Sequence, residues 1–253
     1  MNSDTIILGG ISGCFFTILS HPFHVLTTRY NREVIKGTEP TLQNSIGYTV
    51  EFLRTQPKRL LIRGISMRTL QGTLTYSFLF FVRDHFNRIS SIENQTMRNI
   101  TASASAGYAE NIIIRQPLLT LTSAYINHDN VLSRNLWVNM VKSYPLTSLF
   151  RSLYFTSSTI GKSVGSDFCN TINLSRTSSQ IISGVFGIAF CIRFNGFSES
   201  YTNALTAGQS MNKCFEAGIK GSKNIIRDLN LISRESLFLI PFLFPIDLQF
   251  KKP

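Results

Sequence analysis

Six stretches of the chain are apolar over about the length of a membrane-spanning helix. They cover residues 4–30, 68–86, 100–127, 153–172, 178–201 and 229–250. A helix needs roughly 20 residues to cross the hydrocarbon core of a bilayer. The first stretch is the clearest, because residues 5–28 contain no Asp, Glu, Lys or Arg. The pattern predicts an all-α membrane protein with six transmembrane helices.

Charged residues interrupt the later stretches, and a helix surface that faces lipid would not tolerate them. We expect these side chains to face the interior of a helical bundle or to lie near the membrane interfaces. The mean hydropathy of +0.08 is modest and suits helices that line a polar interior. The interrupting residues are Glu110, Arg115, Lys162, Asp167, Arg193, Arg234 and Glu235.

The apolar stretches form a threefold repeat. In each unit, an apolar stretch is followed by a less hydrophobic segment, a basic residue next to Gly or Ser, and a second apolar stretch. Such units must pack against their copies, so the sequence predicts one membrane domain over 1–253 with repeats of approximately 1–92, 93–176 and 177–253. The basic steps are Arg63 with Gly64, Arg151 with Ser152, and Lys220 with Gly221.

The segment between the two apolar stretches of a unit has an amphipathic pattern. In the first unit, Ile46, Val50 and Leu53 fall on one helical face. In the second unit, Leu136 and Met140 do so, together with neighbouring apolar residues. This pattern predicts short helices that lie on the membrane surface. An ordinary amphipathic loop helix is the alternative.

These features resemble the mitochondrial carrier family, whose members contain three repeats of two transmembrane helices with a short matrix-side helix between them. In the first repeat, Gly9 and Gly13 precede Pro22 as the small residues of that family do, and Asp84 follows Gly64 at the family's spacing. The resemblance covers nearly the whole chain and is weakest in the third repeat. It implies the carrier fold and a multi-pass location in the mitochondrial inner membrane.

The residues that close the matrix side in that family are replaced in this chain. In the family, each odd-numbered helix ends in a proline followed by an acidic and a basic residue, and the charged residues form a ring of salt bridges. An ion pair of this type cannot form here, so the resemblance implies a degenerate gate. The corresponding positions are Pro22, His24 and Thr27; Pro117, Leu119 and Thr122; and Phe194, Gly196 and Glu199.

The resemblance also implies a central cavity lined by the even-numbered helices. Counting onward from the basic steps gives Gln71 and Thr159 as side chains that could hydrogen-bond a small ligand. Neither is an arginine, which does not favour an anionic ligand at those two positions. Lys162, Arg115 and Arg193 could add positive charge elsewhere in the cavity, or they could pair with groups at interfaces and between helices.

A phospholipid is the one bound molecule that the resemblance implies. Members of the family bind cardiolipin at the beginnings of the even-numbered helices, where free amides and the helix dipole attract anions. The basic steps Arg63-Gly64, Arg151-Ser152 and Lys220-Gly221 fall at those points, and the net charge of +11 agrees with contact to anionic lipid. A generic positive flank is the alternative.

Catalytic and metal-binding patterns are not found in the sequence. The four cysteines form no CxxC pair, and His21 and His24 lack the HExxH context of a zinc site. The Lys and Arg residues are spread along the chain rather than clustered with aromatic residues, which does not indicate nucleic-acid binding. We therefore expect neither an enzyme nor a metalloprotein.

Two functions remain open from the sequence. In the first, the chain no longer transports and serves as a structural accessory subunit of an inner-membrane assembly such as a respiratory complex, with other inner-membrane subunits and lipids as partners. The replaced gate residues favour this hypothesis. In the second, it is a working mitochondrial solute carrier with an unusual small-molecule substrate.

Overall fold

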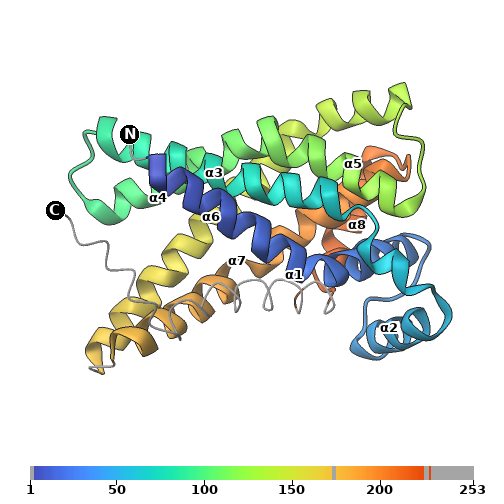
Figure 1. Cartoon of the computed structure of the whole chain (residues 1–253), viewed down its shortest axis with the longest axis horizontal. Helices are drawn as coiled ribbons and strands as arrows, with labels where there is room; N and C mark the ends of the chain where they lie inside the picture. The colour runs from blue at the N-terminus through green and yellow to red at the C-terminus, as the bar shows by residue number, and fades with distance from the viewer. Residues whose placement is uncertain (1–2, 173–174, 225–227, 229–253) are drawn as a thin grey trace.

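The computed structural model describes residues 3–172, 175–224 and 228, and these are almost entirely helical (Figure 1). The all-α part of the predicted fold class is thus confirmed. The helices are α1 (Ser3–Ile35), α2 (Leu42–Thr55), the 3₁₀ helix η1 (Lys58–Ile62), α3 (Ile65–Ile89), α4 (Gln95–Glu110), the π-helix η2 (Asn111–Arg115), α5 (Gln116–Asn127), α6 (Arg134–Thr171), α7 (Arg176–Thr206) and α8 (Met211–Gly221).

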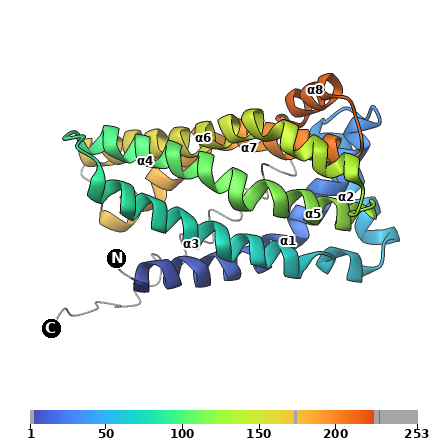
Figure 2. The same ribbon diagram turned by 90° about the horizontal axis from the view of Figure 1, so that it is seen from above.

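The long helices run side by side along the length of the molecule, and the short helices α2 and α8 lie near one end of this bundle (Figures 1 and 2). Helix α1 packs against α3, α4 packs against α6, and α7 packs against both α6 and α8. Helix α4 continues through η2 into α5 as one long rod (Figure 2). The bundle therefore has one end where α1, α5 and α7 terminate and another where α3 meets α4 and α6 meets α7.

Small residues allow α1 and α3 to approach closely. A Cβ atom on Gly13 would overlap the carbonyl oxygen of Gly72, and a Cβ on Gly72 would overlap the Thr17 hydroxyl and lie 2.7 Å from the carbonyl oxygen of Gly13. Glycine is required at such points because any side chain would push the two backbones apart. The same holds between α6 and α7, where a Cβ on Gly161 would lie 2.6 Å from the carbonyl oxygen of Phe186.

Polar side chains fill much of the interior where α1, α5 and α7 meet. The buried residues there include Thr28 and Asn31 of α1, Gln116 and Thr120 of α5, and Thr202 of α7. The two larger apolar clusters lie instead beneath the short helices α2 and α8. One contains Leu26, Tyr30, Val34 and Phe52, and the other contains Met140, Phe197, Tyr201, Ala204, Leu205, Cys214 and Ala217.

The prediction of six transmembrane helices is wrong. Within the described residues, no helix combines the length and the apolar character that crossing a membrane requires. Residues 5–28 are free of ionised side chains but contain Gly, Ser, Thr, His and Pro, and these dilute the apolar character of the stretch. The other described stretches add charged residues to polar ones, and stretch 229–250 lies outside the described residues.

The same finding overturns the expectations that depended on membrane spans. The membrane carrier fold, the description as a transmembrane mitochondrial carrier and the multi-pass location in the inner membrane are contradicted. The short helices also differ from the expectation in the second unit, where residues 134–144 continue through Pro145 into the single helix α6. The boundaries of the three repeats stay a prediction.

The close contact between α1 and α3 makes a stability prediction. We expect Gly72→Ala to lower the free energy of unfolding by about 1–3 kcal/mol, because the new methyl group must displace Thr17 or separate the helices. The measurement is urea unfolding followed by circular dichroism.

Gly47→Ala on α2 is the matched control. Nothing lies within 4 Å of a Cβ at Gly47, so alanine should raise stability by about 0.5–1 kcal/mol through its better helix propensity. Equal effects of the two substitutions would contradict the close packing of α1 on α3.

Candidate functional site

A cavity of about 790 Å³ lies between the long helices. Buried side chains line its inner part, and the exposed side chains of Arg83, Lys162 and Asp167 lie toward its mouth, at the end where α3 meets α4 and α6 meets α7. Five basic side chains and two carboxylates are among the lining residues, namely Arg68, Arg83, Arg115, Arg151, Lys162, Asp167 and Glu199.

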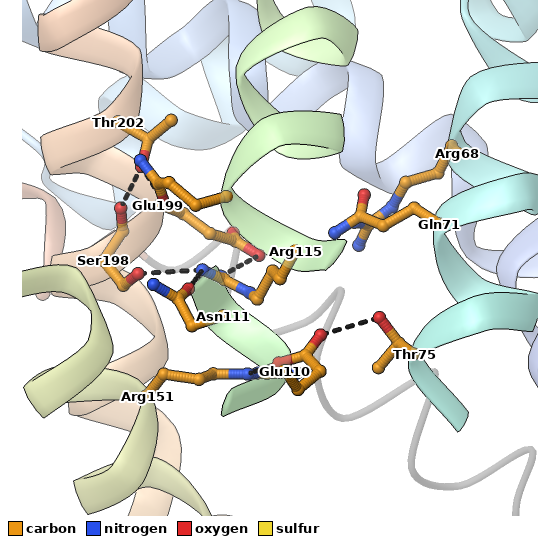
Figure 3. Close-up of polar contacts among 11 residues, drawn as sticks. Arg68, Gln71, Thr75, Glu110, Asn111, Arg115, Arg151, Ser198, Glu199 and Thr202 are labelled. Carbon is orange, nitrogen blue, oxygen red and sulfur yellow. Dashed lines mark hydrogen bonds and ion pairs between the residues drawn. The ribbon is translucent and has the colours of Figure 1, made fainter. Parts of the chain in front are cut away.

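The π-helix η2 places Arg115 in the interior. Pro117 lies two residues after Arg115 and has no backbone N–H, which disturbs the regular hydrogen-bond ladder and favours such a widened turn. The guanidinium Nη1 of Arg115 donates to Ser198 Oγ at 2.9 Å and to Asn111 Oδ1 at 3.4 Å (Figure 3). Its Nη2 lies 3.9 Å from Glu199 Oε1, so Arg115 joins η2 to α7.

Glu110 of α4 joins two further helices. Its carboxylate is fully buried and accepts hydrogen bonds from Arg151 Nε of α6 at 2.9 Å and from Thr75 Oγ1 of α3 at 2.7 Å (Figure 3). The guanidinium of Arg151 also lies over the rings of Phe155 and Tyr154, at 4.3 and 4.9 Å from their centroids. Both oxygens of Glu110 are therefore satisfied by protein donors.

Arg68 completes what we call the inner cluster, which consists of Arg68, Glu110, Arg115, Arg151 and Glu199. Nη1 of Arg68 donates to Gln71 Oε1 at 2.6 Å. The pKa of Arg115 is lowered to about 9, mainly by burial and also by the positive charges of Arg151 and, more weakly, Arg68, while Glu199 and Glu110 oppose this shift. Arg115 nevertheless stays protonated at neutral pH, so with every member ionised the inner cluster has one positive charge in excess.

Five side chains were expected to line a central cavity, and four of them line the cavity described above. Gln71, Thr159, Lys162 and Arg115 line it, and Thr159 shares a hydrogen bond of 2.8 Å with Ser103. Arg193 does not line the cavity. It is exposed, and its Nη1 donates to the carbonyl oxygen of Ser222 at 2.6 Å. The sequence-based count missed Arg68, which lies one helical turn before Gln71.

The residues at the predicted gate positions are mostly buried. Among them, Glu199 lies next to Arg115. The hydroxyls of Thr27 and Thr122 donate to carbonyl oxygens of their own helices. The remaining positions lie on the same three rods: Pro22 on α1, Pro117 and Leu119 on α5, and Phe194 and Gly196 on α7.

A different contact joins the ends of α1, α5 and α7. Arg32, in the last turn of α1, forms an ion pair with Asp129 just after α5, and its Nη2 also donates to Thr206 Oγ1 at 2.8 Å at the end of α7. Nearby, Arg29 Nη2 donates to the carbonyl oxygen of Ile126 at 2.8 Å. No sequence pattern indicates this contact beyond the position of each residue near the end of a helix.

The three basic steps lie in different surroundings. Arg63 is bound to the end of α5, since its Nε donates to the carbonyl oxygen of Tyr125 at 2.8 Å, and Gly64 has a positive φ of 80° at the N-cap of α3. Arg151 belongs to the inner cluster, and Ser152 Oγ donates to the carbonyl oxygen of Ala104. Lys220 is exposed beside Glu216, and Gly221 is buried against Ser200. Phospholipid binding at these steps stays a prediction.

Among the described residues, no three His, Cys, Asp or Glu side chains lie close enough to hold a metal ion. No protein-family model matches the chain, and no curated protein matches it significantly. The resemblance to mitochondrial carriers therefore rests on the sequence motifs alone.

Glu110 provides a test of the inner cluster. We expect Glu110→Ala to lower the free energy of unfolding by about 3–5 kcal/mol, because it leaves the buried Arg151 without its carboxylate. Asp84→Ala is the control. Its partner Arg88 is half exposed, so the loss should be at most about 1 kcal/mol. Similar losses in urea unfolding would contradict the buried pair.

His21 makes the stability dependent on pH. It is fully buried, its Nε2 donates to the carbonyl oxygen of Arg63 at 3.0 Å, and burial lowers its pKa from 6.5 to about 4. A histidine whose pKa is lower in the folded state binds protons more readily when unfolded. Its contribution is thus fully present above pH 6.5 and is lost as the pH falls toward 4.

We expect the wild-type protein to lose roughly 2–3 kcal/mol of stability through His21 between pH 6.5 and 4. This component should disappear in His21→Gln, whose amide can still donate to Arg63. It should persist in His85→Gln, because His85 is exposed. Urea unfolding at stepped pH measures it, and parallel pH profiles for wild type and His21→Gln would count against a buried neutral imidazole.

Proposed function

We propose that the protein binds a small organic anion in the cavity between its long helices. The observation that carries this proposal is the excess of positive charge among the side chains that line this cavity. Five basic side chains line the cavity against two carboxylates, and two positive charges remain in excess even when Glu110, the partner of Arg151, is counted. Charge in a partly desolvated site acts on a ligand far more strongly than charge in bulk water.

The apolar part of the cavity wall supports an organic ligand over a simple inorganic ion. Tyr76, Phe80, Tyr154 and Phe155 line the cavity together with the charged residues. Ligand sites are typically mostly apolar, with a few polar groups that fix orientation, and have volumes of about 300–1,000 Å³. The size and the mixed wall of this cavity fit a carboxylate with an apolar body.

This proposal differs from the expectation at Gln71 and Thr159, which did not favour an anion. The two positions are indeed uncharged. Arg68 lies one turn before Gln71 on α3, and Arg151 lies two turns before Thr159 on α6, while Arg115 comes from η2. Two of the three positive charges therefore lie on neighbouring turns of the helices that contain Gln71 and Thr159.

The proposal predicts selective binding of an anion over a neutral ligand of the same shape. We expect 3-phenylpropanoate to bind and 3-phenylpropanamide to bind at least about tenfold more weakly, because a hydrogen bond to a charged group contributes about 1.5–3 kcal/mol. Isothermal titration calorimetry at low salt measures both. Equal affinities for the acid and the amide would refute an anion site.

Arg68→Gln tests the assigned location. We expect it to weaken 3-phenylpropanoate about tenfold or more, because it removes one of the inner positive charges while keeping a polar side chain. Arg193→Gln is the matched control, since Arg193 is an exposed arginine outside the cavity. If both variants weaken binding equally, the effect comes from the overall charge of the protein rather than from the cavity.

A structural role in a larger protein assembly is the second candidate function. One observation favours it: α1 exposes an apolar stripe of Ile7, Ile11, Phe15 and Ile18, with exposed fractions of 43–62%. Contiguous exposed apolar surface of this kind often marks an interaction site. Cross-linking mass spectrometry in intact cells tests this role, which requires one recurrent partner cross-linked next to this stripe.

A further inference from the structure

Glu199 has an acceptor that the described protein does not satisfy. The side chain lines the cavity and is 4% exposed. Its Oε1 lies 3.9 Å from Arg115 Nη2, beyond hydrogen-bond distance, and its buried Oε2 has no hydrogen-bond partner among the described residues. Buried polar groups are nearly always hydrogen-bonded, and leaving one unsatisfied destabilises the protein. A donor on a bound molecule would remove this destabilisation.

Arg115 is not free to supply that donor. Its Nη1 already donates to Ser198 and to Asn111. Turning the guanidinium toward Glu199 would break these contacts and leave Asn111 and Ser198, both buried, with fewer partners. Glu199 therefore lines the cavity as a carboxylate with no close donor among the described residues.

The charge of the surroundings favours a neutral donor over an ammonium group. Arg115 lies close enough to Arg68 and Arg151 for both charges to act on it. An ammonium beside Glu199 would be a further positive charge in a cluster that already has one in excess. A hydroxyl group can donate to Glu199 without adding charge.

We infer that the cavity selects a hydroxy acid, with its hydroxyl donating to the Glu199 carboxylate and its carboxylate facing the inner arginines. Figure 3 shows Arg68 and Gln71 on α3 pointing across the interior toward the side on which Arg115 and Glu199 lie. Arg115 Nη2 lies 3.9 Å from Glu199 Oε1, so a carboxylate that faces Arg115 and a hydroxyl that faces Glu199 fit on adjacent carbons. This inference rests on the proposed anion binding and narrows its ligand class.

Three probes that differ only at carbon 2 test the inference. These are 3-phenyllactate with a hydroxyl, 3-phenylpropanoate with a hydrogen and phenylalanine with an ammonium group. In calorimetric titrations of the wild-type protein, we expect 3-phenyllactate to bind about tenfold or more tighter than 3-phenylpropanoate, because only the hydroxyl satisfies Glu199. Phenylalanine should bind most weakly.

The outcomes separate this inference from the function on which it rests. Equal binding of 3-phenyllactate and 3-phenylpropanoate overturns the hydroxy-acid preference and leaves anion binding intact. If phenylalanine binds most tightly of the three, the prediction that a neutral group rather than an ammonium donates to Glu199 is overturned. Failure of all three probes to bind overturns both the anion site and its preference for a hydroxyl.

A variant pair assigns the preference to Glu199. In Glu199→Ala, the affinities for 3-phenyllactate and 3-phenylpropanoate should converge. In Asp84→Ala, which removes a carboxylate of α3 outside the cavity, the wild-type ratio should persist. A ratio unchanged in a folded Glu199→Ala protein overturns the assignment, and the wild-type probe series remains decisive if this variant does not fold.

Discussion

The buried carboxylate of Glu110 is the constraint on which the interior depends. It is removed from water completely, and it is satisfied only because Thr75 and Arg151 reach it from two other helices. Desolvation of such a pair offsets much of its attraction, so the pair is a weak source of net stability. What it fixes is position, because α3, α4 and α6 cannot rotate or slide without stranding a charge. The cavity keeps its shape for the same reason.

The distribution of apolar and polar residues follows from this interior. Since the middle of the bundle contains arginines, carboxylates, hydroxyls and amides, the two larger apolar clusters lie under the short helices α2 and α8, and part of the apolar surface of α1 faces outward. Close backbone contact at Gly13 and Gly72 holds α1 against α3 where few large side chains lie between them. Apolar packing therefore stabilises the part of the bundle near the short helices, and polar contacts join the helices in the middle.

Local features of the sequence predicted part of this structure. Apolar periodicity predicted helices, and the charges of Glu110 and Arg115 in otherwise apolar stretches predicted side chains that face inward, where both are buried. Spanning helices were predicted wrongly because a stretch without charge, such as residues 5–28, is not necessarily apolar. The pairing of Arg32 with Asp129, 97 residues later, could not be predicted, because it depends on how helix ends meet in space. The same applies to Arg68, whose role depends on the rotation of α3.

The two ends of the bundle differ in a way that bears on how a ligand reaches the inner cluster. At the mouth, exposed Arg83 and Lys162 present two positive charges against the single negative charge of Asp167, and an excess of charge of one sign in a cleft raises the local concentration of an oppositely charged ligand. At the other end, Arg32 joins α1 to Asp129 after α5 and to Thr206 of α7. Burial lowers the pKa of Arg32 and raises the pKa of Asp129, and each is partly offset by the other, so the pair is held together in a half-buried place. The mouth therefore attracts an anion toward the inner cluster, whereas the contacts of Arg32 with Asp129 and Thr206 hold the opposite end together.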